Sequence, residues 1–348
     1  MNNCRVFFFL ASLMLIAGCS DEYGLFNDEL TITGEYEEIV VLYANIDLSS
    51  KLNLIRVNRG FSADNFHENS NMPDSIQFAP GANEVRFHKI YKGDTTTYVC
   101  YDTLVDKEDS ELFNTEKVLM HAFRADDLLA YDLDDLHYVI EVRTQDGTKT
   151  SSSTTPVGRF SFLRPLNSWD EYCFGQDDFQ VNIEAPLNSQ AYEITADVGY
   201  RDFRLNGRQI DTVNQQFRFT IVRHLASRPS GGVHPISGSE PVFRVAVQSD
   251  KFYAALASHI RQNSDTVNTV YRKFRGVVFN ATCGNPDLAQ VMSVNPNSLG
   301  FAENFVYNNV NNGFGYVSAY TKCKTHKLPV SMATVFFVGE KYPQFRFR

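Results

Sequence analysis

The chain has 348 residues and a formal net charge of −9, with 43% hydrophobic and 21% charged residues. This composition supports a sizeable buried core and excludes a disordered chain. The acidic balance argues against nucleic-acid binding, which needs a basic stripe, and against close approach to an anionic membrane surface. The 28 phenylalanines and 17 tyrosines favour strands, because aromatic side chains pack well on a pleated sheet.

The first 18 residues have the features of a signal peptide that ends at a cysteine. A short basic segment precedes residues 6–16, which are apolar except for one serine. This apolar run is too short to span a bilayer, which needs about 20 residues. Two small residues then precede Cys19, a pattern that resembles the lipobox of bacterial lipoproteins. We expect residues 1–18 to be removed and Cys19 to be lipidated; an ordinary secretory signal with a chance cysteine is the alternative.

Three polar residues, Ser20, Asp21 and Glu22, follow this cysteine directly. An acidic pair in this place resembles the surface-export signal of Bacteroidetes lipoproteins, which implies the outer face of the outer membrane. The alternative is a solvated linker, since charged runs near chain ends are usually that. We expect residues 19–28 to form a lipidated tether, because several acyl chains anchor a protein stably where one does not.

Short strand-like segments recur between the tether and residue 157, with turn signals beside them. The expected strands are residues 38–45, 51–59, 85–91, 97–102 and 137–143. Glycine next to aspartate indicates turns at residues 92–94 and 145–147. Regular short strands favour an immunoglobulin-like β-sandwich, which we place at residues 29–157. The Ser- and Thr-rich residues 148–158 mark its boundary.

The second domain, residues 158–348, is predicted to be β-rich with one α-helix. Its expected strands are residues 179–184, 191–197, 216–222, 271–280, 315–321 and 333–338. Residues 226–241, which are rich in glycine and proline, are expected to form a loop. The fold class is therefore mostly β: an immunoglobulin-like sandwich followed by a β-rich domain with a helix.

The helix is predicted near residues 250–261. Phe252, Leu256 and Ile260 repeat there on one helical face, and Asp250 is the expected N-cap. Residues 286–292 are a further candidate for a short helix.

Short motifs resemble a large group of uncharacterised Bacteroidetes outer-membrane lipoproteins. Val-Leu-Tyr-Ala-Asn-Ile-Asp at residues 41–47, followed by Ile-Arg-Val-Asn-Arg-Gly-Phe at residues 55–61, is similar to the opening of these proteins. Asn-Asn-Val-Asn-Asn-Gly-Phe-Gly at residues 308–315 resembles their turn near the C-terminus, which leads into a strand. Members are often encoded beside TonB-dependent receptors of the SusC type, so the resemblance implies such a partner. It implies no catalytic residue.

Four cysteines remain besides the signal-peptide cysteine and the lipidated one: Cys100, Cys173, Cys283 and Cys323. Their spacings are unlike a zinc-binding CxxC pattern. An oxidising compartment permits a disulfide, although sequence alone cannot choose among the pairings. We expect Cys283 to pair with Cys323, because both lie in the last segment; buried free thiols are the alternative.

Five motifs of Asp followed by Ser or Thr, and then by an aliphatic residue or Thr, resemble the O-glycosylation sequon of exported Bacteroidetes proteins. The hydroxyls belong to Ser75, Thr95, Thr103, Thr212 and Thr266. The alternative is structural, because Asp-Thr is common at turns that lead into strands.

The sequence contains no local signature of catalysis or of metal binding, so we expect no metal and no cofactor. The eight histidines form neither HxH nor HExxH, and GxSxG, GxxxxGK[ST] and GxGxxG do not occur. Aspartates gather at residues 126–135 without the spacing of a calcium-binding loop, so a solvated acidic loop is expected. The charged residues between 201 and 211 are interpreted as exposed strand and hairpin charges.

The leading hypothesis is a surface-exposed outer-membrane lipoprotein, a non-enzymatic accessory subunit of a TonB-dependent, SusC-like uptake or export complex. It rests on the resemblance, because sandwich folds host many functions. The second hypothesis is a stand-alone glycan-binding surface lipoprotein, which predicts an exposed aromatic platform. The third is a hydrolase with a site assembled from distant residues. The expected partners are the outer membrane, through the anchor, and a receptor-like membrane protein or a glycan, but not nucleic acid.

Overall fold

The computed structural model describes residues 39–60, 77–106, 117–129, 133–166, 168, 171–225, 233–235, 241–293 and 307–348. These residues belong to one compact unit, Ile39–Arg348, with one hydrophobic core. The predicted signal peptide, Cys19 and residues 20–22 lie outside the described residues. The described fold is mostly β, as predicted, with three sheets and three α-helices.

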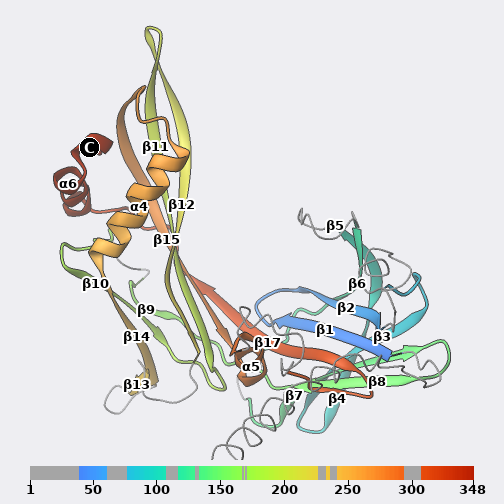
Figure 1. Ribbon diagram of the computed structural model, residues 1–348. Coiled ribbons are helices and arrows are strands. Elements are labelled where there is room, and N and C mark those ends of the chain that lie inside the picture. The colour runs from blue at the N-terminus through green and yellow to red at the C-terminus, as the bar shows by residue number, and fades with distance from the viewer. Residues whose placement is uncertain are drawn as a thin grey trace, which may run out of the picture. The chain divides into compact units, whose positions relative to one another are not determined.

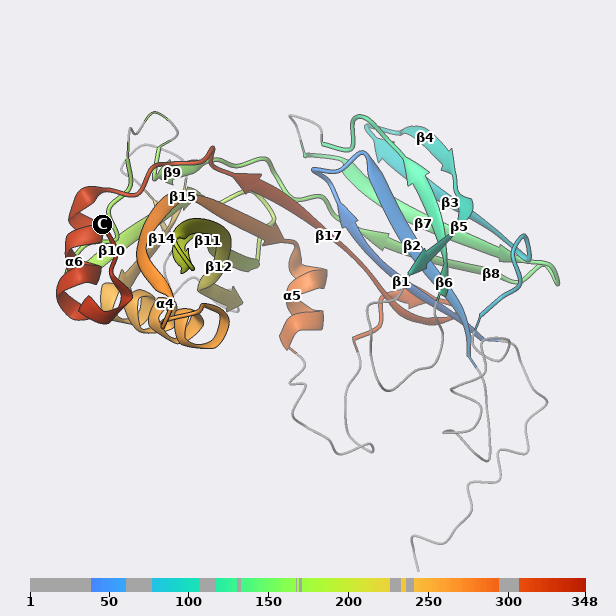
Figure 2. The ribbon, with the colours of Figure 1, turned by 90° about the horizontal axis from the view of Figure 1, so that it is seen from above.

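Two facing sheets form the N-terminal β-sandwich (Figures 1 and 2). Its strands are β1 (Ile39–Asp47), β2 (Leu52–Gly60), β3 (Asn83–Tyr91), β4 (Asp94–Val99), β5 (Tyr101–Asp106), β6 (Lys117–Arg124), β7 (Leu136–Thr144) and β8 (Lys149–Thr154). Strands β1-β2-β6-β5 are neighbours in one sheet and β8-β7-β3-β4 in the other. Immunoglobulin domains have strands A-B-E-D in one sheet and G-F-C in the other, and β4 takes the place of the additional C′ strand. The predicted immunoglobulin-like sandwich is therefore confirmed.

Alternating side chains of these strands fill the space between the two sheets. Every second residue of β1 from Val40 to Ile46 is buried, as a strand with one face toward the core requires. The ring of Phe87 on β3 stacks on Phe123 of β6 with centroids 4.3 Å apart, which connects the two sheets.

A strand near the end of the chain extends the first sheet. β17 (Phe314–Lys324) pairs in parallel with β1, and the short β16 (Val310–Asn311) pairs with β8. Asn312 and Gly315 have positive φ angles of 52° and 112°, so the turn predicted at residues 308–315 is confirmed. A Cβ at position 315 would lie 2.0 Å from the carbonyl oxygen of Leu42. Only glycine therefore fits where β17 begins to follow β1.

The C-terminal part of the chain supplies the other strands and the helices. They are β9 (Phe162–Arg164), β10 (Asp178–Glu184), β11 (Ala191–Asn206), β12 (Gln209–Leu225), β13 (Val233–Pro235), β14 (Pro241–Gln248), α4 (Ser249–Asn263), β15 (Thr269–Gly284), α5 (Pro286–Ser293), α6 (Met332–Lys341) and the 3-10 helix η2 (Pro343–Phe345). β15 pairs with both β11 and β17, so the first sheet continues from the sandwich into β15, β11 and β12. The division of the chain at residues 157 and 158 into two domains stays a prediction.

The four-stranded sheet β13-β14-β10-β9 packs against β11 and β15. Tyr192 of β11 stacks on Phe243 of β14 with ring centroids 4.3 Å apart. Helix α4 covers this part of the core, and its Phe252 stacks on Phe174 at 3.8 Å. Helices α4 and α6 lie side by side in both views, and Lys341 pairs there with the Asp250 carboxylate (Figures 1 and 2).

Helix α4 confirms the predicted helix, with Phe252, Leu256 and Ile260 buried on one face. Its N-cap is Gln248 and not Asp250, which lies in the first turn and places its charge near the positive end of the helix dipole. Residues 286–292 form α5, as predicted.

The strand predicted at residues 333–338 is wrong, because these residues lie in helix α6. The Ser331 side chain accepts a hydrogen bond from the Thr334 backbone N–H, which starts the helix. Thr334, Val335 and Val338 are buried at helical spacing. A short apolar run is compatible with a buried strand or a buried helix, and the cap decides here.

Candidate functional site

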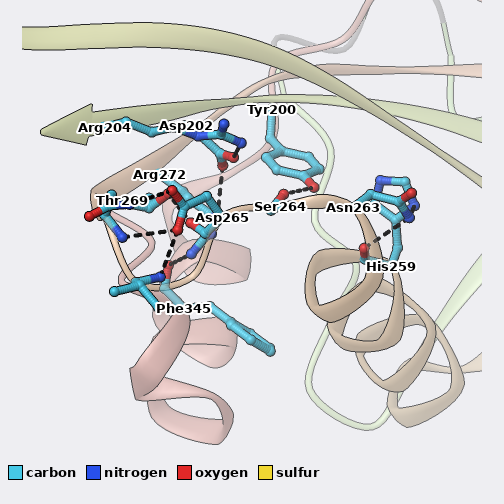
Figure 3. A network of polar contacts seen from close by, with 12 residues as sticks. Tyr200, Asp202, Arg204, His259, Asn263, Ser264, Asp265, Thr269, Arg272 and Phe345 are labelled. Carbon is cyan, nitrogen blue, oxygen red and sulfur yellow. Dashed lines mark hydrogen bonds and ion pairs between the residues drawn. The ribbon is translucent and has the colours of Figure 1, made fainter. Parts of the chain in front are cut away.

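The long hairpin β11–β12, the beginning of β15 and the last residues of the chain meet in a region rich in polar contacts (Figure 3). We call residues 199–213, 264–275 and 345–348 the hairpin end. Strand β11 pairs with β12 as far as the turn at Gly207 and with β15 as far as Thr269. Its two faces carry different chemistry, because neighbouring residues of a strand point to opposite sides of a sheet.

An ion pair is buried on the inner face, which packs toward α4. Asp202 of β11 and Arg272 of β15 are directly opposite in register and are 0% and 1% exposed. The Arg272 Nε donates to the Asp202 carboxylate at 2.9 Å, and Arg204 donates to its other oxygen at 3.0 Å. Both carboxylate oxygens are therefore engaged (Figure 3).

Further donors of Arg272 hold the end of the chain. Its Nη1 donates to the carbonyl oxygen of Phe345 at 2.8 Å and its Nη2 to that of Asp265 at 3.4 Å. Its backbone N–H donates to Arg346 and its carbonyl accepts from Arg348, both at 3.0 Å. A buried charge without partners costs on the order of several kcal/mol, so these contacts are needed. We call Arg272, Asp202, Arg204 and the two carbonyl groups the Arg272 network.

The interpretation of Asp202 as an exposed charge is wrong. The buried residues of β11 alternate through Val198 and Tyr200, and Asp202 continues the same alternation. A charge in the apolar phase of a strand indicates a buried partner, and this signal is present in the sequence. Arg272 occupies a buried position of β15 directly opposite Asp202. The sequence does not indicate this pairing, because the two residues are far apart in the chain.

A second set of contacts connects the inner face with the end of α4 (Figure 3). The hydroxyl oxygens of Tyr200 and Ser264 lie 2.9 Å apart. His259 packs edge-on against Tyr200, and its Nδ1 lies 3.2 Å from the Asn263 amide nitrogen. Burial lowers the pKa of His259, although the charge of Asp202 acts in the opposite direction. Among the described residues, no three His, Cys, Asp or Glu side chains gather as they would around a metal ion.

The outer face of the same strands carries aromatic rings and cations. Phe203 of β11 stacks on Tyr271 of β15, with ring centroids 4.2 Å apart and planes at 15°. The guanidinium carbon of Arg348 lies 4.4 Å from the centre of the Tyr271 ring, and Lys273 Nζ lies 5.8 Å from it. Cations at these distances are attracted to the face of the ring.

Aliphatic side chains are exposed at the tip of the hairpin. Leu205 and Ile210 are direct cross-strand partners, and they are 52% and 53% exposed. Val267, in the turn between α4 and β15, is 82% exposed. The Leu205 backbone N–H donates to the carbonyl of Asn268 at 2.9 Å, so this turn lies beside the tip.

Two cavities elsewhere in the molecule share Lys322 in their lining. The first measures about 330 Å³ and is lined partly by Asp126 and Asp127 of the predicted acidic loop; the second measures about 230 Å³. Lys322 pairs with Asp47 at 2.8 Å, and Asp126 with Lys51 at 2.9 Å. The Asp126 side chain is exposed, which agrees with the expected solvated loop. The pairing of Lys322 with Asp47 joins β17 to β1 and carries no signal in the sequence.

The structure contradicts the predicted disulfide, because Cys283 and Cys323 are free thiols, like the other two cysteines of the described residues. On the antiparallel strands β15 and β17, Cys283 lies opposite Thr321 and Cys323 opposite Ala281. The two cysteines are thus diagonal neighbours, which lie about 7–8 Å apart. A disulfide needs Cβ atoms about 4 Å apart. Burial raises the pKa of both thiols.

The sequon hydroxyls are spread over the molecule. Thr95 of β4, Thr212 of β12 and Thr266 after α4 are exposed, and Thr103 of β5 is half-buried. Ser75 lies outside the described residues. The Asp265 carboxylate accepts the backbone N–H of two following residues, which is the turn contact of the structural alternative. Glycosylation stays a prediction.

Neither a model of a known protein family nor a curated protein matches the chain. Among solved structures, the C-terminal globular domain of an oligosaccharyltransferase from Pyrococcus abyssi matches 86% of this chain, with 8% identity and a TM-score of 0.24. The chain spans about half of that structure, 52% of its length. A likeness this weak carries no argument about function. In the part of the chain that is described, no helix has the length and hydrophobicity to cross a bilayer.

Proposed function

We propose that the protein is a surface-exposed outer-membrane lipoprotein that acts as a non-enzymatic binding subunit of a TonB-dependent, SusC-like complex. The observation that carries the proposal is the lipobox-like pattern that ends at Cys19, followed by Ser20 and the acidic pair Asp21 and Glu22. A lipid anchor that is joined to the body by a short linker holds the body near membrane neighbours at an effective concentration on the order of millimolar. Weak contacts with a membrane partner then give a stable complex.

Charged side chains beside the cavities engage one another, which supports binding over catalysis. Lys322 is held by Asp47 and Asp126 by Lys51. A general base or nucleophile must be within reach of substrate, whereas Lys322 and Asp126 are engaged by partners at 2.8 Å and 2.9 Å.

A stand-alone glycan-binding function requires an aromatic ring face open to a sugar. Phe203 and Tyr271 form the aromatic pair at the hairpin end, and both are half-buried. Phe203 stacks on Tyr271 with ring centroids 4.2 Å apart, and the Arg348 guanidinium carbon lies 4.4 Å from the centre of the Tyr271 ring. A sugar that stacks on the Tyr271 ring would compete with these groups, so this pair gives the stand-alone function no support.

Affinity purification of the native protein in mild detergent tests the proposal. We expect a TonB-dependent-receptor-like barrel to co-purify and the contact to weaken with salt where it is polar. Cys19→Ser should reduce recovery of the barrel strongly, whereas His137→Gln, at an exposed position, should leave it unchanged. Recovery as a lone monomer that binds a soluble glycan would contradict the proposal and support the stand-alone function.

A further inference from the structure

The hairpin end is cationic although the chain is acidic. Its three segments contain eight arginines and lysines against three aspartates, while the whole chain carries a net charge of −9. One arginine and one aspartate neutralise each other in the buried pair of the Arg272 network. Arg208, Lys273, Arg346 and Arg348 are exposed. The hairpin end is therefore a positively charged surface on a protein whose net charge is negative.

The same hairpin end also carries aliphatic side chains that have no cover among the described residues. Leu205, Ile210 and Val267 stand together at the tip, each at least half exposed. Exposed apolar side chains next to lysine and arginine are a pattern of segments that bind the interface of a lipid bilayer. The apolar groups enter the interface, and the cations meet the phosphates of the headgroups.

We propose that the hairpin end docks on a lipid surface that carries anionic phosphate headgroups, with Leu205, Ile210 and Val267 entering the interface. A sugar is disfavoured because Phe203 and the Arg348 guanidinium already lie 4.2 Å and 4.4 Å from the centre of the Tyr271 ring. The acidic remainder of the chain does not cancel the attraction, because charges are screened beyond about 10 Å at 0.1 M salt. The contact is separate from the receptor proposed above, and neither requires the other.

The Arg272 network, on the inner face, holds the last residues of the chain in place and so positions two of the cations of this surface. Arg272 accepts the backbone N–H of Arg348, whose guanidinium lies over Tyr271. Arg346 donates to the carbonyl oxygen of Thr269 at 2.7 Å, so the last two arginines are fixed next to the tip. Cations held in place lose less freedom on binding than mobile ones.

Co-sedimentation with vesicles tests the proposal. The polypeptide from residue 20 onward, made without signal, lipid anchor or glycosylation, contains the whole compact unit and separates this contact from the anchor. The polypeptide is made without glycosylation because Thr212 and Thr266 lie in this surface, where a glycan would cover the contact. We expect binding to vesicles of phosphatidylcholine with phosphatidylglycerol, loss of binding in high salt, and no binding to phosphatidylcholine alone. Arg208→Gln and Lys273→Gln should each lower the affinity about five-fold.

Matched variants give the controls. Arg124→Gln with Lys251→Gln makes the same charge change at exposed positions away from the hairpin end and should leave binding unchanged. Leu205→Ser with Ile210→Ser should weaken binding while the melting temperature stays constant, because both side chains are exposed. The proposal is overturned if anionic vesicles do not bind, or if the control pair weakens binding as much as Arg208→Gln with Lys273→Gln. Binding to alginate without binding to vesicles would assign the surface to an acidic glycan and overturn it as well.

Discussion

Arg272 lies in an environment that arginine rarely occupies, because its side chain is fully buried between two strands and the end of the chain. The pair it forms with Asp202 need not add net stability, since desolvating both charges offsets their attraction. Its value is geometric: five donors in a planar group join β11, the turn after α4 and the last residues.

We expect Arg272→Met to lower the free energy of unfolding by about 3–5 kcal/mol, because it leaves Asp202 buried with only Arg204 as a charged partner. Urea denaturation measures this change. The control is Arg201→Met. Arg201 precedes Asp202 on β11 and lies on the outer face, so this substitution should change stability by about 0.5 kcal/mol or less. Equal effects of the two substitutions would show that burial of Arg272 is not what matters.

Histidine burial gives the stability a pH dependence. Burial lowers the pKa of His88, His121 and His259. At His121, the Asp102 carboxylate 2.8 Å away favours the charged form, but burial outweighs it. A histidine with a lower pKa when folded binds fewer protons in the folded state, so stability is lost as pH falls below about 6.5.

The melting temperature should therefore decrease between about pH 7.5 and pH 5.5, and His121→Gln should make this decrease smaller. Thermal unfolding followed by circular dichroism at several pH values measures it. His137→Gln, at an exposed position, serves as the control and should leave the pH profile unchanged. A profile for His121→Gln that matches the unmodified protein would contradict the assignment.

Among the elements, β17 depends most on a single residue. Gly315→Ala places a Cβ against the carbonyl of Leu42 and forces a strained positive φ, so we expect a loss of about 3 kcal/mol or more. Gly339→Ala in α6 meets no heavy atom within 4 Å and should be neutral or stabilising by up to about 1 kcal/mol. Chemical denaturation compares the two, and similar melting of both variants would refute the role of Gly315.

Elements with one buried face could be predicted from sequence. The alternation in β1 and the helical repeat in α4 state which face is buried without any knowledge of the partner. Strand β6 is not among the strands predicted from the sequence. His121, Ala122 and Phe123 are buried in succession, so no alternation of buried and exposed residues indicates a strand there. Helix α6 has a buried apolar run that also suits a strand.

Partners between elements could not be predicted in the same way. The pairing of β17 with β1 and of Asp202 with Arg272 joins residues that are distant in the chain, and neither pattern names its partner. The diagonal placement of Cys283 and Cys323 follows from the register of β15 on β17, which composition does not determine. The positive charge of the hairpin end could not be predicted for the same reason, because its cations come from three separate segments of the chain.

At the scale of the whole molecule, the proposed anchor at Cys19 and the proposed export signal predict which side of the membrane the body occupies. Protease added to intact cells should degrade the protein, and Asp21→Ala with Glu22→Ala should protect it by leaving it in the periplasm. Immunoblotting after protease treatment measures this. An acidic pair moved further from Cys19 should also give protection. Protection of the unmodified protein would place it in the periplasm instead.

The position of β17 beside β1 also determines when the first sheet can be completed during folding. The hydroxyls of Ser49 and Thr321 meet at 3.1 Å although 272 positions separate them in the chain. Closing so long a loop costs entropy before the contact can repay it, which slows folding. The first sheet stays incomplete until synthesis has nearly reached the last residue. If the chain is exported as proposed, this delay would keep the polypeptide unfolded, and able to pass through a translocation channel, until its final strand has crossed.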